Sequence, residues 1–313
     1  MKSKIITICI LVVIVVTTTI LAVNVNEEKH TKFNIVTSFY PMYVATLNVT
    51  DGIDSIEVSN LTYQTTGCIH DYVLTTSELV TLSKADVLVI NGAGMEGFMD
   101  KVISNFEDLD IIDASSGIKL IYNECEQDEH YEHEEHLGHN HETNPHIFVS
   151  VKNYIKQVQN ICDALVKIDS LNKEKYEANT KTYISKLEEL EKEVNSTMLM
   201  IKDKDIVTFH NTFDYFANDY GLNVVGVIEN EHGKTPSAGE IGTLIENIKS
   251  EGVRAIFVEP EYSLKLVDMV AKDTEAKVYM LNPITSGDNN KDEYINIMRE
   301  NLNVLKEALS GKE

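Results

Sequence analysis

The stretch Asp86-Val87-Leu88-Val89-Ile90-Asn91 decides the fold class, because four consecutive aliphatic residues between two polar ones suit a short strand buried on both faces. Helix-like patterns lie on either side of it, at Thr76–Ser83 and Met95–Phe106. Further short strands are predicted at 32–37, 56–61 and 109–113, with a helix at 41–47. This alternation predicts an α/β lobe built on a parallel sheet that helices cover on both faces.

The same alternation returns in the last third of the chain. Strands are predicted at 205–209, 223–228, 255–258 and 277–281, with helices at 212–220, 237–251, 262–272 and 292–309. A second α/β lobe follows from this pattern. Parallel strands present their carboxyl ends at one edge of a sheet, so we expect a ligand to bind in the cleft between the two lobes.

Two helical stretches separate the predicted lobes, at 151–168 and 171–201. In the second, large apolar residues recur on one face: Tyr176, Tyr183, Leu187, Leu190, Val194 and Met198. At a rise of 1.5 Å per residue this helix is about 45 Å long, enough to join two lobes as one rigid helix. The predicted organisation is an N-terminal segment (1–26), an N-terminal lobe (32–168), a linking helix (169–202) and a C-terminal lobe (203–313).

The charge of the chain excludes nucleic acids as partners. The chain has 313 residues, of which 50 are acidic and 27 basic, for a formal net charge of −23. Proteins that bind nucleic acids need a basic face to displace counterions from phosphates, and here no Lys or Arg cluster is longer than a pair. Cations are the expected partners of such a chain.

The N-terminal segment has the layout of an export signal. Lys2 and Lys4 precede the uncharged run Ile5–Val25, which is rich in Ile, Val, Thr and Leu. At 21 residues the run is also long enough to span a bilayer, so it is either an uncleaved membrane anchor, which we favour, or a cleaved signal. In both cases the rest of the chain is predicted to be extracytoplasmic, at the cell surface or in the periplasm.

A polar segment interrupts the first lobe at 124–142, where eight carboxylates and five histidines leave few apolar residues. We interpret it as a mobile loop, because it cannot bury enough surface to offset the entropy of ordering. Imidazole prefers Zn, Cu, Ni or Fe, so the loop is a candidate secondary metal-binding segment; the alternative is a merely solvated acidic loop. Its histidines are His130, His133, His136, His139 and His141.

Three other histidines each follow a predicted strand or begin a helix: His70, His146 and His210. All three are expected to project into the cleft, although each by itself is also typical of an ordinary hydrogen-bonded histidine. The cysteines indicate no disulfide scaffold, since one (Cys9) lies in the apolar run. The other three, Cys68, Cys125 and Cys162, fit no zinc-finger or CxxC spacing and are interpreted as buried or spare thiols, with a Cys68–Cys125 bridge as the alternative.

The local sequences around these histidines resemble a known family. The matching motifs are Asn34-Ile-Val-Thr-Ser-Phe-Tyr-Pro-Met, His70-Asp-Tyr with Thr76-Ser77-Glu78, Leu82-Ser83-Lys84-Ala85-Asp86, Asn91-Gly92, Thr208-Phe-His-Asn-Thr-Phe, Tyr220-Gly-Leu, Pro236-Ser237, Phe257-Val-Glu-Pro and Leu281-Asn-Pro. Asn144-Pro-His stands where the family has Asp-Pro-His. Over residues 32–310 the chain resembles the zinc-binding solute-binding proteins of ABC importers, the ZnuA-like group.

This resemblance implies two α/β lobes joined by a long helix, with a metal ion held between them. His70, His146 and His210 occupy the positions of the family's three histidine ligands. Manganese-binding relatives tend to have a carboxylate in place of the third histidine. Three imidazoles favour tetrahedral Zn²⁺ over an oxygen-preferring ion.

The fourth ligand is open, because this chain departs from the family pattern. It has Ile69 where some relatives provide a Glu, and Ile284 and Thr285 where others use an acid. The candidates are water, a loop histidine, Asp288, Glu231 and His232. Glu259 is expected to be either a hydrogen-bond partner of a ligand histidine or a structural carboxylate.

The function implied is binding without catalysis. A monomeric, membrane-tethered protein would capture extracytoplasmic Zn²⁺ and deliver it to an ABC permease driven by its ATPase, while the loop at 124–142 gathers or senses zinc. One alternative is a manganese- or iron-binding relative, or an adhesin, on the same fold. Another is a zinc hydrolase with an activated water, although His133-Glu134-Glu135-His136 is one residue short of the HExxH spacing.

Overall fold

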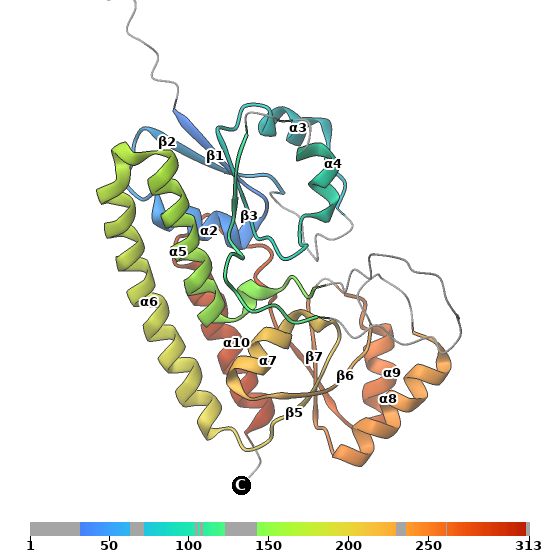
Figure 1. Ribbon diagram of the computed structural model, residues 1–313. Coiled ribbons are helices and arrows are strands. Elements are labelled where there is room, and N and C mark those ends of the chain that lie inside the picture. The colour runs from blue at the N-terminus through green and yellow to red at the C-terminus, as the bar shows by residue number, and fades with distance from the viewer. Residues whose placement is uncertain are drawn as a thin grey trace, which may run out of the picture.

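The computed structural model describes residues 32–62, 72–103, 106, 109–122, 143–229, 236–260 and 262–310. These residues form two α/β lobes with a long helix alongside both (Figure 1). Within these ranges no helix combines the length and the apolar character needed to cross a membrane. The predicted anchor or signal lies outside the described residues.

The first lobe contains a four-stranded sheet in the order β2-β1-β3-β4, with every pair of neighbours parallel. Its strands are β1 (Phe33–Thr37), β2 (Ile56–Asn60), β3 (Val87–Ile90) and β4 (Asp110–Asp113). Val87, Leu88 and Val89 are fully buried, as the sequence predicts for the central strand β3. Helices α2 (Tyr40–Val49) and α3 (Thr76–Leu82) precede β2 and β3, and Pro41 lies in the first turn of α2.

Within the described residues, one helix of this lobe begins later than predicted. The sequence pattern suggests a helix at Met95–Phe106, but the described helical residues are η2 (Gly97–Met99) and α4 (Asp100–Ile103). The cause is a turn at Gly92, Ala93 and Gly94, all three of which have positive φ. Glu96 closes this turn, because its carboxylate accepts the backbone N–H groups at its start. The apolar periodicity does not reveal that these residues are used for a turn.

The second lobe repeats the topology of the first, with a parallel sheet in the order β6-β5-β7-β8. Its strands are β5 (Asp205–Thr208), β6 (Asn223–Val227), β7 (Ala255–Val258) and β8 (Lys277–Met280). Its helices are α7 (Asp214–Tyr220), after the short turn η5 (Asn211–Phe213), α8 (Ala238–Glu251), α9 (Leu264–Thr274) and α10 (Glu293–Leu309). In both lobes the strand order reverses beside the first strand, which is the point where α/β proteins form ligand sites.

A helical pair connects the lobes. The turn η3 (Ile147–Val149) leads into α5 (Val151–Ile168), and η4 (Ser170–Asn172) leads into α6 (Lys173–Met200), which runs beside both lobes in Figure 1. The predicted apolar face of α6 is buried, from Tyr176 to Met198. The predictions of two parallel-sheet lobes and of a long joining helix are therefore confirmed.

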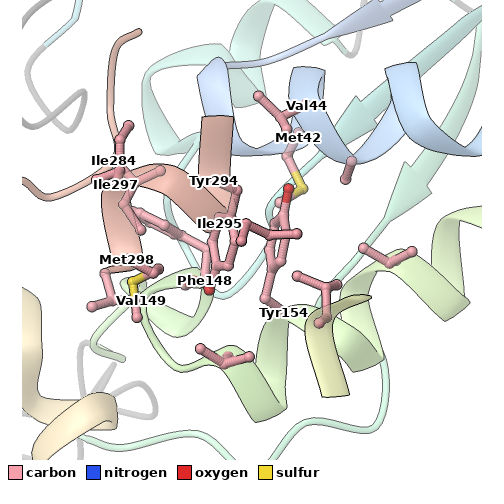
Figure 2. Close-up of a cluster of buried hydrophobic side chains, with 14 of the residues drawn as sticks. Met42, Val44, Phe148, Val149, Tyr154, Ile284, Tyr294, Ile295, Ile297 and Met298 are labelled. Carbon is pink, nitrogen blue, oxygen red and sulfur yellow. Dashed lines mark hydrogen bonds between the residues drawn. The ribbon is translucent and has the colours of Figure 1, made fainter. Parts of the chain in front are cut away.

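The lobes share a hydrophobic core in which α10 of the second lobe meets α2, η3 and α5 of the first (Figure 2). Tyr294 on α10 stacks on Tyr154 of α5, with ring centroids 3.6 Å apart and planes 10° apart. The Tyr294 hydroxyl donates a hydrogen bond to the backbone carbonyl of Phe148, at 2.8 Å. This packing holds the two sheets in a defined relation, and so fixes how the loops at their carboxyl ends face one another.

Candidate metal centre

His146 lies at the end of an extended segment that enters the space between the lobes, just before η3. Its side chain is buried, and its Nδ1 lies 2.9 Å from the side-chain oxygen of Asn144, which also accepts the His146 backbone N–H at 3.0 Å. Because that amide oxygen only accepts, Nδ1 carries the proton. The ring nitrogen that can coordinate a metal is therefore Nε2.

The orientation of the Asn144 amide follows from its other end. Its Nδ2 donates to the backbone carbonyl of Asn211 at 2.9 Å and to a carboxylate oxygen of Asp214 at 3.1 Å. Both partners are acceptors, so nitrogen faces the second lobe and oxygen faces His146. The hydrogen-bond network thus determines the His146 tautomer.

His210 comes from the other lobe. It follows β5 and is the last residue before η5, where parallel strands present their carboxyl ends. The hydrogen bonding between β5 and β7 continues one residue beyond β5, since the Phe209 N–H donates to the Phe257 carbonyl at 2.7 Å. His210 is 6% exposed, and its ring lies edge-on to that of His146 with centroids 5.3 Å apart.

This separation fits a shared ion. With Zn–N bonds of about 2.0–2.1 Å, two imidazoles on one tetrahedral zinc ion place their centroids about 5 Å apart. Two of the three histidines singled out in the sequence, one from each lobe, are therefore brought together as a single ion would require. Their roles as ligands stay a prediction.

Glu259 brings a carboxylate to the same region. It directly follows β7, which pairs with β5, the strand that precedes His210. Its side chain is only 2% exposed, and the Tyr262 ring nearby lies 6.1 Å from that of His210. A buried carboxylate is costly to ionise without a partner, so a cation bound close to it would be favourable. Both interpretations of Glu259, hydrogen-bond partner or structural carboxylate, remain predictions.

A hydrogen-bonded layer supports the His146 segment from the first lobe. Asn91, which follows β3, donates from Nδ2 to the carbonyl of Pro145 at 2.9 Å, and Gln157 of α5 donates to its side-chain oxygen at 2.9 Å. The buried Glu96 accepts from the Ser38 hydroxyl and the Asn91 N–H, both at 2.7 Å, and from the Gly92 N–H at 3.1 Å.

The environment of Glu96 affects its acidity. Desolvation by burial raises its pKa to about 7, although its three hydrogen-bond donors oppose this shift. The sequence analysis missed both Glu96 and the positioning role of Asn91. The sequence does contain a signal for Asn91. It is a polar residue directly after a buried central strand, and such positions lie at the edge of the sheet where ligands bind.

Several predicted site residues lie outside the described residues. They are His70, the loop histidines His130, His133, His136, His139 and His141, and also Glu231, His232, Cys68 and Cys125. Within the described ranges, no group of three metal-ligating side chains gathers. Asp288 is exposed, and its backbone carbonyl accepts the Tyr40 hydroxyl at 2.6 Å. Cys162 is a buried free thiol on α5, which both interpretations of the cysteines allow.

Comparison with known proteins shows to which family the chain belongs. Residues 35–308 match the family model described as zinc-uptake complex component A, periplasmic. The chain belongs to this family. The resemblance to the ZnuA-like group is therefore confirmed, and this group consists of zinc-uptake proteins and is not a known class of enzyme.

Two relatives and one solved structure illustrate the match. The zinc-binding protein AdcA of Streptococcus pyogenes is 32% identical over 90% of this chain, which spans 57% of AdcA. The high-affinity zinc uptake system protein ZnuA of Bacillus subtilis is 30% identical, with 91% of this chain and 90% of ZnuA covered. The Zn(II)-bound ZnuA-like domain of Streptococcus pneumoniae AdcA has a TM-score of 0.71 and 29% identity, covering 90% of this chain and 100% of that domain.

Proposed function

We propose that this chain is the zinc-binding component of an ABC importer, which captures extracytoplasmic Zn²⁺ and delivers it to a membrane permease driven by an ATPase. Membership of the zinc-uptake family supports this function, as do relatives named for zinc binding or zinc uptake. The observation that carries it is the adjacent pair of buried imidazoles, His146 and His210, one from each lobe.

The proposed ligands are His70, His146 and His210, with water or an acidic or histidine side chain in the fourth position. Neutral imidazoles suit a borderline ion such as Zn²⁺ better than the oxygen-preferring Mn²⁺. A site enclosed between lobes suits cargo, because the protein shields the ion until the lobes separate. The family match and the curated relatives favour zinc uptake over the manganese, iron, adhesin and hydrolase alternatives.

The proposed location is the outer face of a membrane. The family description places its members in the periplasm, and a relative from Streptococcus pneumoniae is named zinc-binding lipoprotein AdcA. In this chain we assign tethering to residues 1–26, which would keep a monomeric binding protein close to its permease. The lobes would span 32–168 and 203–313, joined by the helix at 169–202.

Competition titration tests the function. The metal-free full-length chain in detergent is titrated with Zn²⁺ against a chromophoric chelator, together with His70→Ala, His146→Ala, His210→Ala and a deletion of 124–142. We expect one tight site, weakened roughly 100-fold or more by each alanine, since even hydrogen-bond partners of ligands contribute 10- to 100-fold. The deletion should lower total bound zinc but keep the tight site.

Three outcomes would contradict the proposal. Loss of tight binding with residues 124–142 would make the histidine-rich loop the site. Tighter binding of Mn²⁺ than of Zn²⁺ would move the chain to the manganese-binding relatives. Hydrolysis of peptides or esters that the zinc-loaded protein catalyses and His210→Ala abolishes would favour an enzyme.

A further inference from the structure

The side chain of Asn144 lies between the two histidine segments and uses both ends of its amide. Its oxygen holds His146 by the ring Nδ1 and by the backbone N–H, while its nitrogen donates to Asn211 and Asp214, which follow His210 in the second lobe. The residue is fully buried, and these four contacts use its full hydrogen-bonding capacity. No other contact described above ties both histidine segments through one side chain.

We propose that Asn144 is a positioning residue that couples the two imidazoles, setting the distance between His146 and His210 and thereby the affinity for zinc. This inference rests on the proposed function, in which both histidines bind one ion. A movement of the second lobe at Asn211 and Asp214 would pull on the amide nitrogen and so turn the ring that the amide oxygen holds. Lobe position and ligand geometry then change together.

The backbone of Asn144 is held just as firmly. Its carbonyl accepts the Tyr215 hydroxyl of α7 at 2.7 Å, and that same hydroxyl accepts the Ile121 N–H at 2.9 Å. The Asn144 N–H donates to the Ile121 carbonyl at 2.8 Å. The segment before His146 is therefore attached to α7 of the second lobe by its backbone as well as by the Asn144 side chain.

In this chain, the two acceptors that residue 144 meets in the second lobe call for an amide. A carboxylate at residue 144 would still accept from His146, but it would face the Asn211 carbonyl and the Asp214 carboxylate with no hydrogen to donate. Two carboxylates about 3 Å apart disfavour each other's charged form. Asn144→Asp therefore keeps the hydrogen bonds to His146 and removes the two that reach the second lobe, so the His146 ring is no longer held in a fixed relation to His210.

Exchanging the residue types at positions 144 and 214 tests the hydrogen bond between them. In Asn144→Asp/Asp214→Asn the amide at 214 can donate to the carboxylate at 144, which restores one hydrogen bond across the lobes. The four proteins of this cycle, all full-length and in detergent at pH 8, are compared by zinc affinity, by the d–d absorption of the Co²⁺-loaded form and by the unfolding midpoint of the apo form. The Co²⁺ spectrum reports ligand geometry, which a purely structural role would leave unchanged.

We expect Asn144→Asp to weaken zinc binding about 10- to 100-fold and to alter the Co²⁺ spectrum, as for other residues that orient a metal ligand. The double variant should recover about tenfold or more of this loss. As a matched control, Asn160→Asp on α5 also removes an amide that donates to two backbone carbonyls, at 2.8 Å each. It should lower only the unfolding midpoint.

The proposal is overturned if Asn144→Asp binds zinc like the wild type, or if the double variant shows no recovery. A measurement on the unmodified protein covers the case in which Asn144→Asp does not fold. In ¹⁵N NMR of the apo protein, His146 should be a single tautomer protonated at Nδ1, and an Nε2-protonated or averaged ring would overturn the coupling. If the wild type itself binds no zinc tightly, the proposed function fails; if it binds zinc but the cycle shows no coupling, only this inference fails.

Discussion

At the residue scale, the proposed metal ligands are held in place by side chains that are not themselves proposed to touch the ion. Glu96 illustrates this, because it accepts hydrogen bonds from Ser38 and from the start of the turn after β3, and thereby positions Asn91 under Pro145. His146 follows Pro145 directly, so a change at Glu96 reaches the ligand through two hydrogen bonds. Ligand and support together form the functional unit.

The raised pKa of Glu96 predicts a pH-dependent stability. In the unfolded chain its proton leaves near the ordinary value of 4.5, whereas the folded protein holds it until about pH 7. Between these values the folded state binds more protons, so the contribution of Glu96 to stability is complete below pH 4.5 and is lost as pH rises to 7. Urea unfolding of the apo protein should show this fall.

The variant Glu96→Gln serves as the comparison for that prediction. Its neutral amide does not titrate, so the difference in unfolding free energy between the wild type and the variant should shrink from pH 4.5 to pH 7. The variant should be less stable at low pH by about 1–3 kcal/mol, because a glutamine nitrogen cannot accept the N–H groups that meet the carboxyl. A pH-independent difference would mean that Glu96 titrates normally in the folded protein.

The sequence predicted the ligand candidates of the described residues better than their supports. His146 and His210 were found because each stands where the chain leaves a strand or enters a helical turn, a position that topology directs toward the cleft. Asn144 and Asn91 enter the sequence analysis only as members of motifs that resemble the family, without a role of their own. Their roles depend on which groups three-dimensional packing brings opposite them, and sequence spacing carries no such information.

At the element scale, α10 illustrates a similar limit. Its amphipathic pattern predicts a helix at 292–309, close to the observed Glu293–Leu309. Periodicity cannot say that this C-terminal helix packs against α2 and α5 of the first lobe (Figure 2). The later start of the helix after β3 has a local cause, since the turn that Glu96 closes takes the place of the first residues of the predicted helix.

The α10 packing predicts unequal effects of two substitutions at Tyr294. Tyr294→Phe keeps the ring on Tyr154 but removes the hydrogen bond to the Phe148 carbonyl, and should cost about 1–2 kcal/mol of unfolding free energy. Tyr294→Ala also opens a cavity between the lobes and should cost about 3–5 kcal/mol. Denaturant unfolding of the apo protein measures both.

The two variants show whether the lobes unfold together or separately. Equal, small losses for both variants would mean that the lobes do not share a cooperative core. A large loss for Tyr294→Ala, in a single unfolding transition, would mean that α10 holds the lobes together as one folding unit. Zinc affinity should then fall as well, because the segments that carry His146 and His210 lose their fixed relation.

At the scale of the whole molecule, a ligand held between the lobes must stabilise both of them. An ion that binds only the folded state raises the unfolding free energy by about 2.7 kcal/mol when free zinc is 100 times the dissociation constant, and by about 4.1 kcal/mol at 1,000 times. The melting temperature should therefore rise steadily with free Zn²⁺. Deletion of 124–142 should leave this rise intact, since the proposed tight site lies elsewhere.

Calorimetry at controlled free Zn²⁺ measures this linkage, and His210→Ala provides its control. That variant keeps the histidine-rich loop and so still binds zinc weakly, but it lacks one of the two imidazoles brought together between the lobes. If its melting temperature rises as much as that of the wild type, stabilisation comes from the loop or the surface. If the rise is lost, the binding energy of the ion enters at the lobe interface, where it can hold the lobes together until the cargo is delivered.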